Sequence, residues 1–208
     1  SEEKFAMRNK IYSERRRKLH TFFKNVIKNS FINGWINNNQ TMADDTITDP
    51  LTGLYNQFGI NSYLKELHPQ IGISYAIVLL NVDNYKDIQA QYGIKAAEVA
   101  LISTASIISD NLRETDLIGR YGEHEFILIL SNITLEYANS VARRIAENVQ
   151  SKLLKVKTQS ILLQASCGIS VSEQDAYSDA ILQQADQALF AAKSNGINQI
   201  RDHSTIAS

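Results

Sequence analysis

The chain has 208 residues, of which 44% are hydrophobic and 21% are charged, and its formal net charge is -1. This length allows one substantial core with an appendage, and the near-neutral charge gives no reason to expect nucleic acid as a partner. A single cysteine excludes a disulfide framework and favours a reducing cytosol. Apolar runs all fall short of the ~18–20 residues that a membrane helix needs.

The first 28 residues carry nine basic and three acidic side chains, with apolar residues recurring near helical spacing. This pattern predicts a basic amphipathic helix within a helical stalk or linker over residues 1–46. We expect the stalk to form a homodimer, and the alternative is contact with anionic lipid near a membrane anchor. The first residue is Ser rather than Met, so we expect a cytoplasmic protein or the cytosolic part of an inner-membrane receptor, with its anchor upstream.

From residue 49 onward, helical and strand patterns alternate. Two of the expected strands are separated by a short glycine-containing turn, which predicts a β-hairpin. The last helix is followed by Gly196, a typical residue just beyond a helix C-terminus. The expected helices cover residues 58–67, 96–112, 135–152 and 177–195, and the expected strands cover 75–82, 117–121, 125–130 and, as a pair or one long strand, 160–172. The sequence therefore predicts one α/β domain with mixed strand directions over residues 47–208.

Four separate segments carry a recognisable pattern, in a consistent order along the chain. Residues 49–56 read D-P-L-T-G-L-Y-N, and residues 80–86 read L-N-V-D-N-Y-K. Residues 120–126 read R-Y-G-E-H-E-F, and residues 185–193 read A-D-Q-A-L-F-A-A-K. Together they resemble the GGDEF family of diguanylate cyclase domains, whose signatures include D-x-L-T-x-L-x-N, D-x-D-x-F-K and R-Y-G-G-D-E-F.

The resemblance implies a nucleotidyl-cyclase-like fold of the α+β type, with a central, mostly antiparallel sheet flanked by helices. It also implies the family's chemistry, in which two GTP-loaded domains join to form cyclic di-GMP. A fold does not by itself deliver an activity, so each functional position has to be compared with the family pattern.

The family positions that hold Mg²⁺ are altered in this chain. The resemblance places Asn81 at the first aspartate of D-x-D and His124 at the acidic third position of the signature. Mg²⁺ prefers anionic oxygen ligands, whereas an amide oxygen is neutral and imidazole is a poor match. We therefore expect no Mg²⁺ cofactor and no catalytic residue. Asp83 is kept and is expected to be structural, and a softer ion such as Zn²⁺ at His124 is the alternative.

Other positions of the expected degenerate site also depart from the family. Glu123 adds bulk and negative charge where the second signature glycine stands, while Glu125 is retained. The guanine-reading Asn and Asp of the family fall at Gln89 and Glu98, each one methylene longer. Lys193 is retained as a phosphate contact, so GTP sensing is a further hypothesis, which Glu123 opposes.

One family site is preserved. Arg113 and Asp116 form an R-x-x-D motif, with five residues between Asp116 and Gly122. The resemblance implies that this is the product-inhibition site, which binds cyclic di-GMP in active relatives and stands at the same offset. A guanidinium can bind a guanine edge or a phosphate, and a carboxylate can accept from guanine N1–H. We expect the turn to expose both side chains on one rim, with Arg144 (or Arg143) adding a cation. The alternative is a surface ion pair.

These observations predict a catalytically inactive GGDEF domain that acts as a cyclic di-GMP receptor through Arg113 and Asp116. A second hypothesis is a nucleotide-independent module for dimerisation or for binding a protein partner. A third is a residual diguanylate cyclase.

Overall fold

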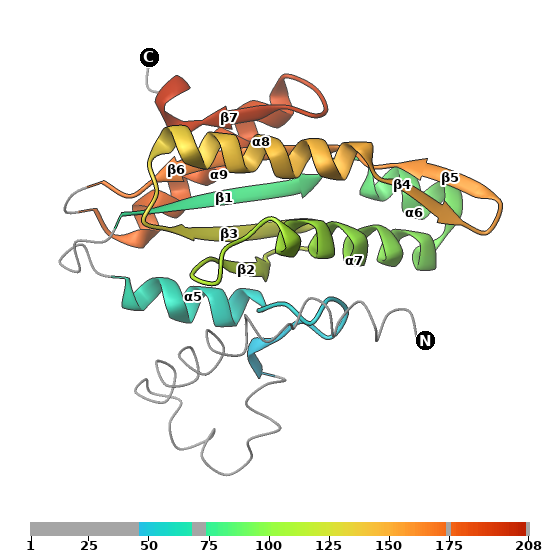
Figure 1. Ribbon diagram of the computed structural model, residues 1–208, viewed down its shortest axis with the longest axis horizontal. Coiled ribbons are helices and arrows are strands. Elements are labelled where there is room, and N and C mark those ends of the chain that lie inside the picture. Colours follow the sequence, from blue (N-terminus) through green and yellow to red (C-terminus); the bar gives the residue numbers. More distant parts are fainter. Residues whose placement is uncertain (1–45, 68–73, 174–175, 207–208) are drawn as a thin grey trace, which may run out of the picture.

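The structure is a computed structural model that describes residues 46–67, 74–173 and 176–206 (Figure 1). The stalk expected over residues 1–46 lies outside the described residues except for Thr46, so the stalk and its boundary stay predictions. Within the described part of the chain, no helix combines the length and hydropathy needed to cross a bilayer.

A five-stranded sheet forms the centre of the fold, in the order β2-β3-β1-β6-β7 (Figure 1). The β1 strand pairs antiparallel with both β3 and β6, β2 pairs antiparallel with β3, and β7 alone is parallel to its neighbour β6. The strands are β1 (Tyr75–Val82), β2 (Leu117–Arg120), β3 (Glu125–Ser131), β6 (Ala165–Val171) and β7 (Ile200–Asp202). The expected mostly antiparallel sheet is confirmed.

Helices cover both faces of this sheet, and the alternation of side chains along β1 shows which helices cover which face. Ala76, Val78 and Leu80 belong to the core shared with α7 (Ile94–Asp110) and α8 (Leu135–Ser151). Ile77 and Leu79 face the other way, into the core shared with α5 (Gln57–Glu66) and α9 (Ser178–Ser194). All eight residues of β1 are buried, as expected for a central strand.

The expected hairpin of β2 and β3 is confirmed, and so are the four expected helices, each to within two residues at both ends. Gly196 follows the last helix with a φ of 115°, a value that favours glycine. The short helix α6 (Tyr85–Tyr92) and the strands β4 (Leu153–Val156) and β7 were not expected. All three are short, and their periodicity is correspondingly weak.

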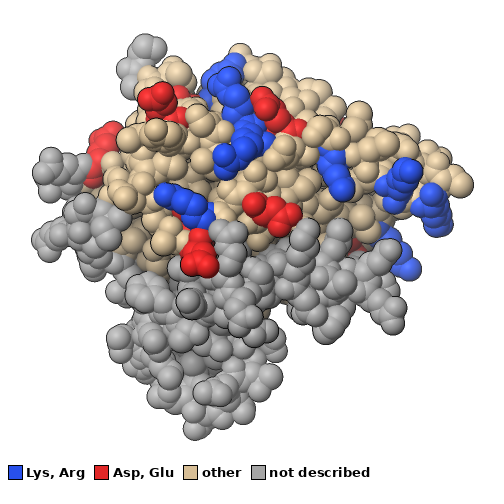
Figure 2. Space-filling model, viewed as in Figure 1, with Lys and Arg blue, Asp and Glu red and all other residues tan. Residues whose placement is uncertain are grey.

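The segment expected as a strand pair over residues 160–172 is divided between two sheets. Its first part is β5 (Gln159–Leu162), which pairs with β4 (Leu153–Val156) in a separate two-stranded sheet, and its second part is β6. Residues 151–163 contain three lysines and no acidic residue. Figure 2 shows basic side chains gathered at the end of the molecule where Figure 1 places β4 and β5. Elsewhere on this face, acidic and basic side chains are mixed.

Candidate functional site

The end of β1 carries two of the polar residues singled out in the sequence. Asn81 is only 2% exposed, and its amide donates to the Oδ1 atom of Asp83 over 3.1 Å. The Oδ2 atom of Asp83 accepts from the Ser166 hydroxyl at 2.7 Å and from the Asn198 backbone N–H at 3.0 Å. Asp83 therefore ties β1 to β6 and to the loop before β7, which is the structural role expected for it.

At the tip of the β2–β3 hairpin, the Glu123 carboxylate is engaged by two groups from α6. Its Oε2 atom lies 2.7 Å from the Lys86 ammonium nitrogen, and its Oε1 atom lies 3.5 Å from the Tyr85 hydroxyl. The hydrogen bond from Lys86 is the main cause that lowers the pKa of Glu123, although burial opposes it. Glu123 is therefore ionised at neutral pH, and its charge neutralises the lysine beside it.

The next residue of the hairpin, His124, packs on Tyr85. The two rings are stacked, with centroids 5.2 Å apart and planes 18° apart. Burial is the main cause that lowers the pKa of His124, followed by the positive charge of Lys193, so the imidazole is neutral at neutral pH. Its Nδ1 atom is buried and has no hydrogen-bond partner among the described residues.

Glu125 begins β3 directly opposite Asn81 of β1. Burial raises the pKa of Glu125, the nearby Asp186 carboxylate raises it further, and Lys193 lowers it. The fold therefore brings Glu125 and His124 within the electrostatic reach of Lys193, which lies in the last turn of α9. We call Asn81, Glu123, His124, Glu125 and Lys193 the hairpin cluster.

The remaining two residues of the predicted degenerate site lie on neighbouring helices. Gln89 belongs to α6 and Glu98 to α7, and both side chains are partly buried. The two helices follow each other through Gly93, which has a φ of 93°. Both residues are thus on elements that follow β1 in the chain.

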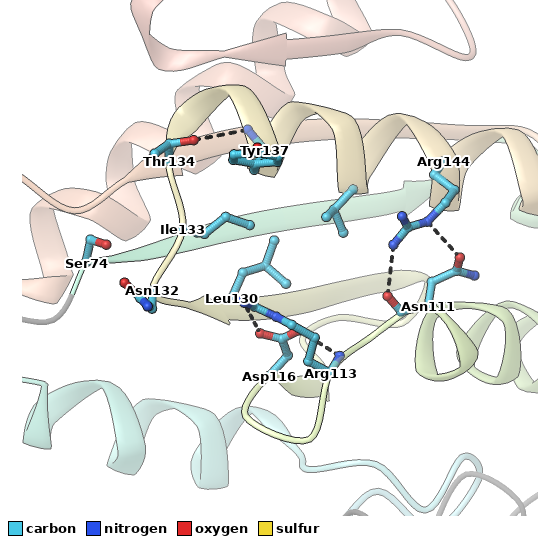
Figure 3. A pocket seen from close by; sticks show the side chains of 11 residues that line it. Ser74, Asn111, Arg113, Asp116, Leu130, Asn132, Ile133, Thr134, Tyr137 and Arg144 are labelled. Atoms are coloured by element: carbon cyan, nitrogen blue, oxygen red, sulfur yellow. Dashed lines mark hydrogen bonds and ion pairs between the residues drawn. The ribbon is translucent and has the colours of Figure 1, made fainter.

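A groove lies on the same face of the molecule as α8, between that helix and the loop that leads into β2 (Figure 3). Its volume is about 590 Å³. We call it the arginine groove, because two guanidinium groups line it. Its lining residues are Ser74, Asn111, Arg113, Asp116, Leu130, Asn132, Ile133, Thr134, Tyr137, Val141 and Arg144. The three residues predicted to bind a ligand are therefore brought together.

Asp116 does not point outward in this groove, and the expectation that it shares an exposed rim with Arg113 is wrong. Its side chain is 3% exposed, whereas that of Arg113 is 53% exposed. The carboxylate accepts from the Arg113 backbone N–H, Nε and Nη2 at 2.8, 3.2 and 3.1 Å, and from the Ser131 backbone N–H at 3.1 Å. These four bonds occupy the four lone-pair positions of a carboxylate. Asp116 closes the turn and holds the arginine.

The Arg113 guanidinium is fixed on one side only. Its Nε and Nη2 atoms bond Asp116, and Nη2 also donates to the Ser131 carbonyl. Its Nη1 atom makes no hydrogen bond to any described residue, so two N–H donors remain available. Arg144 is held similarly, by Asn111, whose Oδ1 and backbone carbonyl lie 3.0 and 3.2 Å from its nitrogens (Figure 3). The neighbouring Arg143 does not line the groove.

Comparison with known proteins decides the family. The family model described as "Diguanylate cyclase, GGDEF domain" matches residues 46–199. The chain belongs to the GGDEF family. Diguanylate cyclase A of Treponema denticola is 33% identical over 186 residues, which cover 85% of this chain and 50% of that protein. The chain spans half or less of the length of the curated relatives it matches.

Solved GGDEF structures share the fold. Diguanylate cyclase SiaD of Pseudomonas aeruginosa, solved with its activator SiaC, is 28% identical with a TM-score of 0.72, over 89% of this chain and 72% of that one. The GGDEF domain of DgcB from Caulobacter crescentus, solved with cyclic di-GMP, is 22% identical with a TM-score of 0.72, over 76% of this chain and 96% of that one. At that identity the second likeness shows the fold alone.

Sequence reasoning missed several residues of the arginine groove. The Asn111 side chain accepts a hydrogen bond from Arg144, and the Ser131 backbone N–H donates to the Asp116 carboxylate. Tyr137 also lines the groove. An asparagine next to a helix end and an exposed tyrosine in a first helical turn are common, so neither carries a signal alone. Only the packing of α8 over the β2 loop brings them to Arg113.

Proposed function

We propose that this GGDEF domain binds cyclic di-GMP in the arginine groove and does not synthesise it. The observation that carries the proposal is a groove of about 590 Å³ in which two guanidinium groups are held by protein acceptors through Nε and Nη2, while the Nη1 atom of each makes no hydrogen bond to a described residue. A cavity of this size suits a small ligand. The solved relatives that contain cyclic di-GMP support the choice of ligand.

The Arg113 guanidinium is one group that would contact the ligand. Its Nη1 donors match either the O6/N7 edge of guanine or a phosphate oxygen, both of which accept hydrogen bonds from guanidinium. Because Asp116 already fixes Nε and Nη2, the arginine loses little side-chain freedom on binding. Arg144 places a second positive charge beside the same groove, where it would offset the two phosphates of the ligand.

The absence of synthesis is supported by the hairpin cluster. Condensation of GTP in this family depends on Mg²⁺, an ion that requires anionic oxygen in near-octahedral geometry. Asn81 offers a neutral amide whose nitrogen is bonded to Asp83, and His124 offers a neutral imidazole. These donors do not fit Mg²⁺, and the described residues contain no group of three His, Cys, Asp or Glu side chains that could hold a metal. Glu123 also neutralises Lys86, a cation that phosphates would otherwise meet at this end of the hairpin.

A calorimetric titration tests ligand binding. Wild-type protein is expected to bind cyclic di-GMP, and Arg113→Ala is expected to weaken binding by at least tenfold, because a charge-assisted hydrogen bond contributes about 1.5–3 kcal/mol. Arg143→Ala is the matched control, since it removes the same charge from an exposed residue of α8 outside the groove. Wild-type protein that releases no heat at high ligand concentration would reject the proposal and leave a protein-interaction role.

A separate assay tests the absence of synthesis. Purified protein is incubated with GTP and Mg²⁺ or Mn²⁺, and chromatography is used to look for cyclic di-GMP. We expect none from the wild type. Product formation that disappears in a His124→Ala variant would show that the hairpin cluster is catalytic and would refute the inactive assignment.

We also propose that the domain works in the cytosol as a homodimer joined through the stalk. The basic amphipathic pattern over residues 1–28 and the single buried cysteine support this proposal. Sedimentation of the full chain and of a chain starting at residue 47 tests it, and an equal number of chains per particle in the two samples would refute it.

A further inference from the structure

The rim of the arginine groove carries an exposed aromatic residue that the proposed function does not yet use. Tyr137 is 67% exposed and lines the groove. It lies in the first turn of α8, where its backbone N–H donates to the Thr134 hydroxyl over 3.3 Å. This N-cap fixes the start of the helix and with it the position from which the tyrosine ring extends.

The groove combines the surfaces that a purine nucleotide needs. Leu130, Ile133 and Val141 give it an apolar wall, and Figure 3 shows Tyr137 and Arg144 coming from α8 on one side while Arg113 comes from the loop on the other. Flat aromatic surface next to guanidinium groups is the combination on which bases stack while their phosphates are neutralised.

The hydrogen bonds of Asp116 leave a guanine base with fewer polar partners in this groove. Its four lone-pair positions are taken by Arg113 and Ser131, so it has none left for the N1–H and exocyclic amine of guanine. A ligand held only through the Nη1 donors of Arg113 and Arg144 would have its base edge bonded but no aromatic surface against its ring faces. The Tyr137 ring could cover one of those faces, which would contribute favourably to the free energy of binding.

We propose that Tyr137 is the stacking platform for a guanine base of the ligand in the arginine groove. The inference rests on the proposed function, because it deepens the description of the same site. Stacking depends on the ring and not on the hydroxyl, so Tyr137→Phe is expected to bind cyclic di-GMP within about twofold of wild type. Tyr137→Ala removes the ring, and we expect binding to weaken by about 5- to 150-fold, the range that base stacking on aromatic side chains covers.

The test is a calorimetric titration of cyclic di-GMP into full-length wild type, Tyr137→Phe, Tyr137→Leu and Tyr137→Ala. Leucine keeps apolar bulk without an aromatic face, so it separates stacking from simple burial and is expected to bind at least about fivefold more weakly than phenylalanine. Tyr177→Ala is the matched control, because Tyr177 is also 67% exposed but does not line the groove. Thermal melts check that each variant is folded.

The outcomes are distinct. Wild-type affinity in Tyr137→Ala, or equal affinities of the leucine and phenylalanine variants, would overturn the stacking role while leaving cyclic di-GMP binding intact. Absence of binding by the wild type, or wild-type affinity in Arg113→Ala, would overturn the proposed function, and the stacking role with it.

Discussion

The four hydrogen bonds to Asp116 predict that this residue supports the fold more than the neighbouring arginine does. In Asp116→Asn the side-chain oxygen can serve either the Ser131 or the Arg113 backbone N–H, and the new amide NH₂ faces the other donor. A buried donor left without an acceptor costs about 1–3 kcal/mol, and the charge assistance to Arg113 is lost as well. We expect the free energy of unfolding to fall by about 2–4 kcal/mol, which corresponds to a fall in Tm of roughly 5–15 °C for a domain of this size.

Urea and thermal unfolding measure this change, with two variants for comparison. Glu114→Gln makes the same carboxylate-to-amide change on an exposed residue of the same turn and is expected to have little effect. Arg113→Ala is expected to cost less than about 1 kcal/mol, since its side chain is 53% exposed and solvent screens its ion pair. An Asp116→Asn variant as stable as Glu114→Gln would refute the reasoning and mean that the carboxylate is free to contact ligand.

Three further predictions concern other parts of the domain. The pKa of His124 is lowered in the folded state, so the unfolded chain binds the proton more readily. The free energy of unfolding should therefore fall as the pH drops from 7 through the unfolded pKa of about 6.5. Urea titrations at several pH values measure this fall, which should be smaller in His124→Gln. Gly168→Ala should lower the free energy of unfolding by about 3 kcal/mol or more, because the added Cβ would lie 2.2 Å from the backbone nitrogen of Leu189. Gly122→Ala is the control, since its Cβ would lie 3.3 Å from the nearest atom. Equal Tm values of the two variants would contradict the prediction. Burial raises the pKa of the Cys167 thiol to about 12, so a thiol reagent at pH 8 should react only after unfolding, and rapid reaction in native buffer would show that the site opens.

The close approach at Gly168 also shows where sequence and structure inform each other. A glycine within a strand pattern indicates close approach of another backbone, but the sequence does not say which. In the structure α9 crosses β6 at this point, and Ala185 and Leu189 supply the atoms that leave no room for a side chain. The identity of the partner depends on helix packing across the sheet.

Much of the domain could be predicted from its residues. The β1 strand is an uninterrupted apolar run, the β2–β3 turn carries a glycine, and the long helices have a clear period, because these features depend on neighbours a few residues away. The changes at Asn81 and His124 could also be found by comparison with the family pattern. The short elements α6 and β7 could not, since their few residues owe their conformation to packing against the sheet.

The sequence by itself determined the family, the order of the main elements, and the chemical types present at the altered signature and at the R-x-x-D motif. Only the tertiary structure decided that Asp116 turns inward, that Lys86 pairs with Glu123, and that Tyr137 joins two arginines in one groove. The physical reason is that spacing along the chain decides which side chains are available. Segments far apart in the sequence meet only after folding. Their contacts decide which donors bond to a carboxylate and how much of that carboxylate is exposed to water.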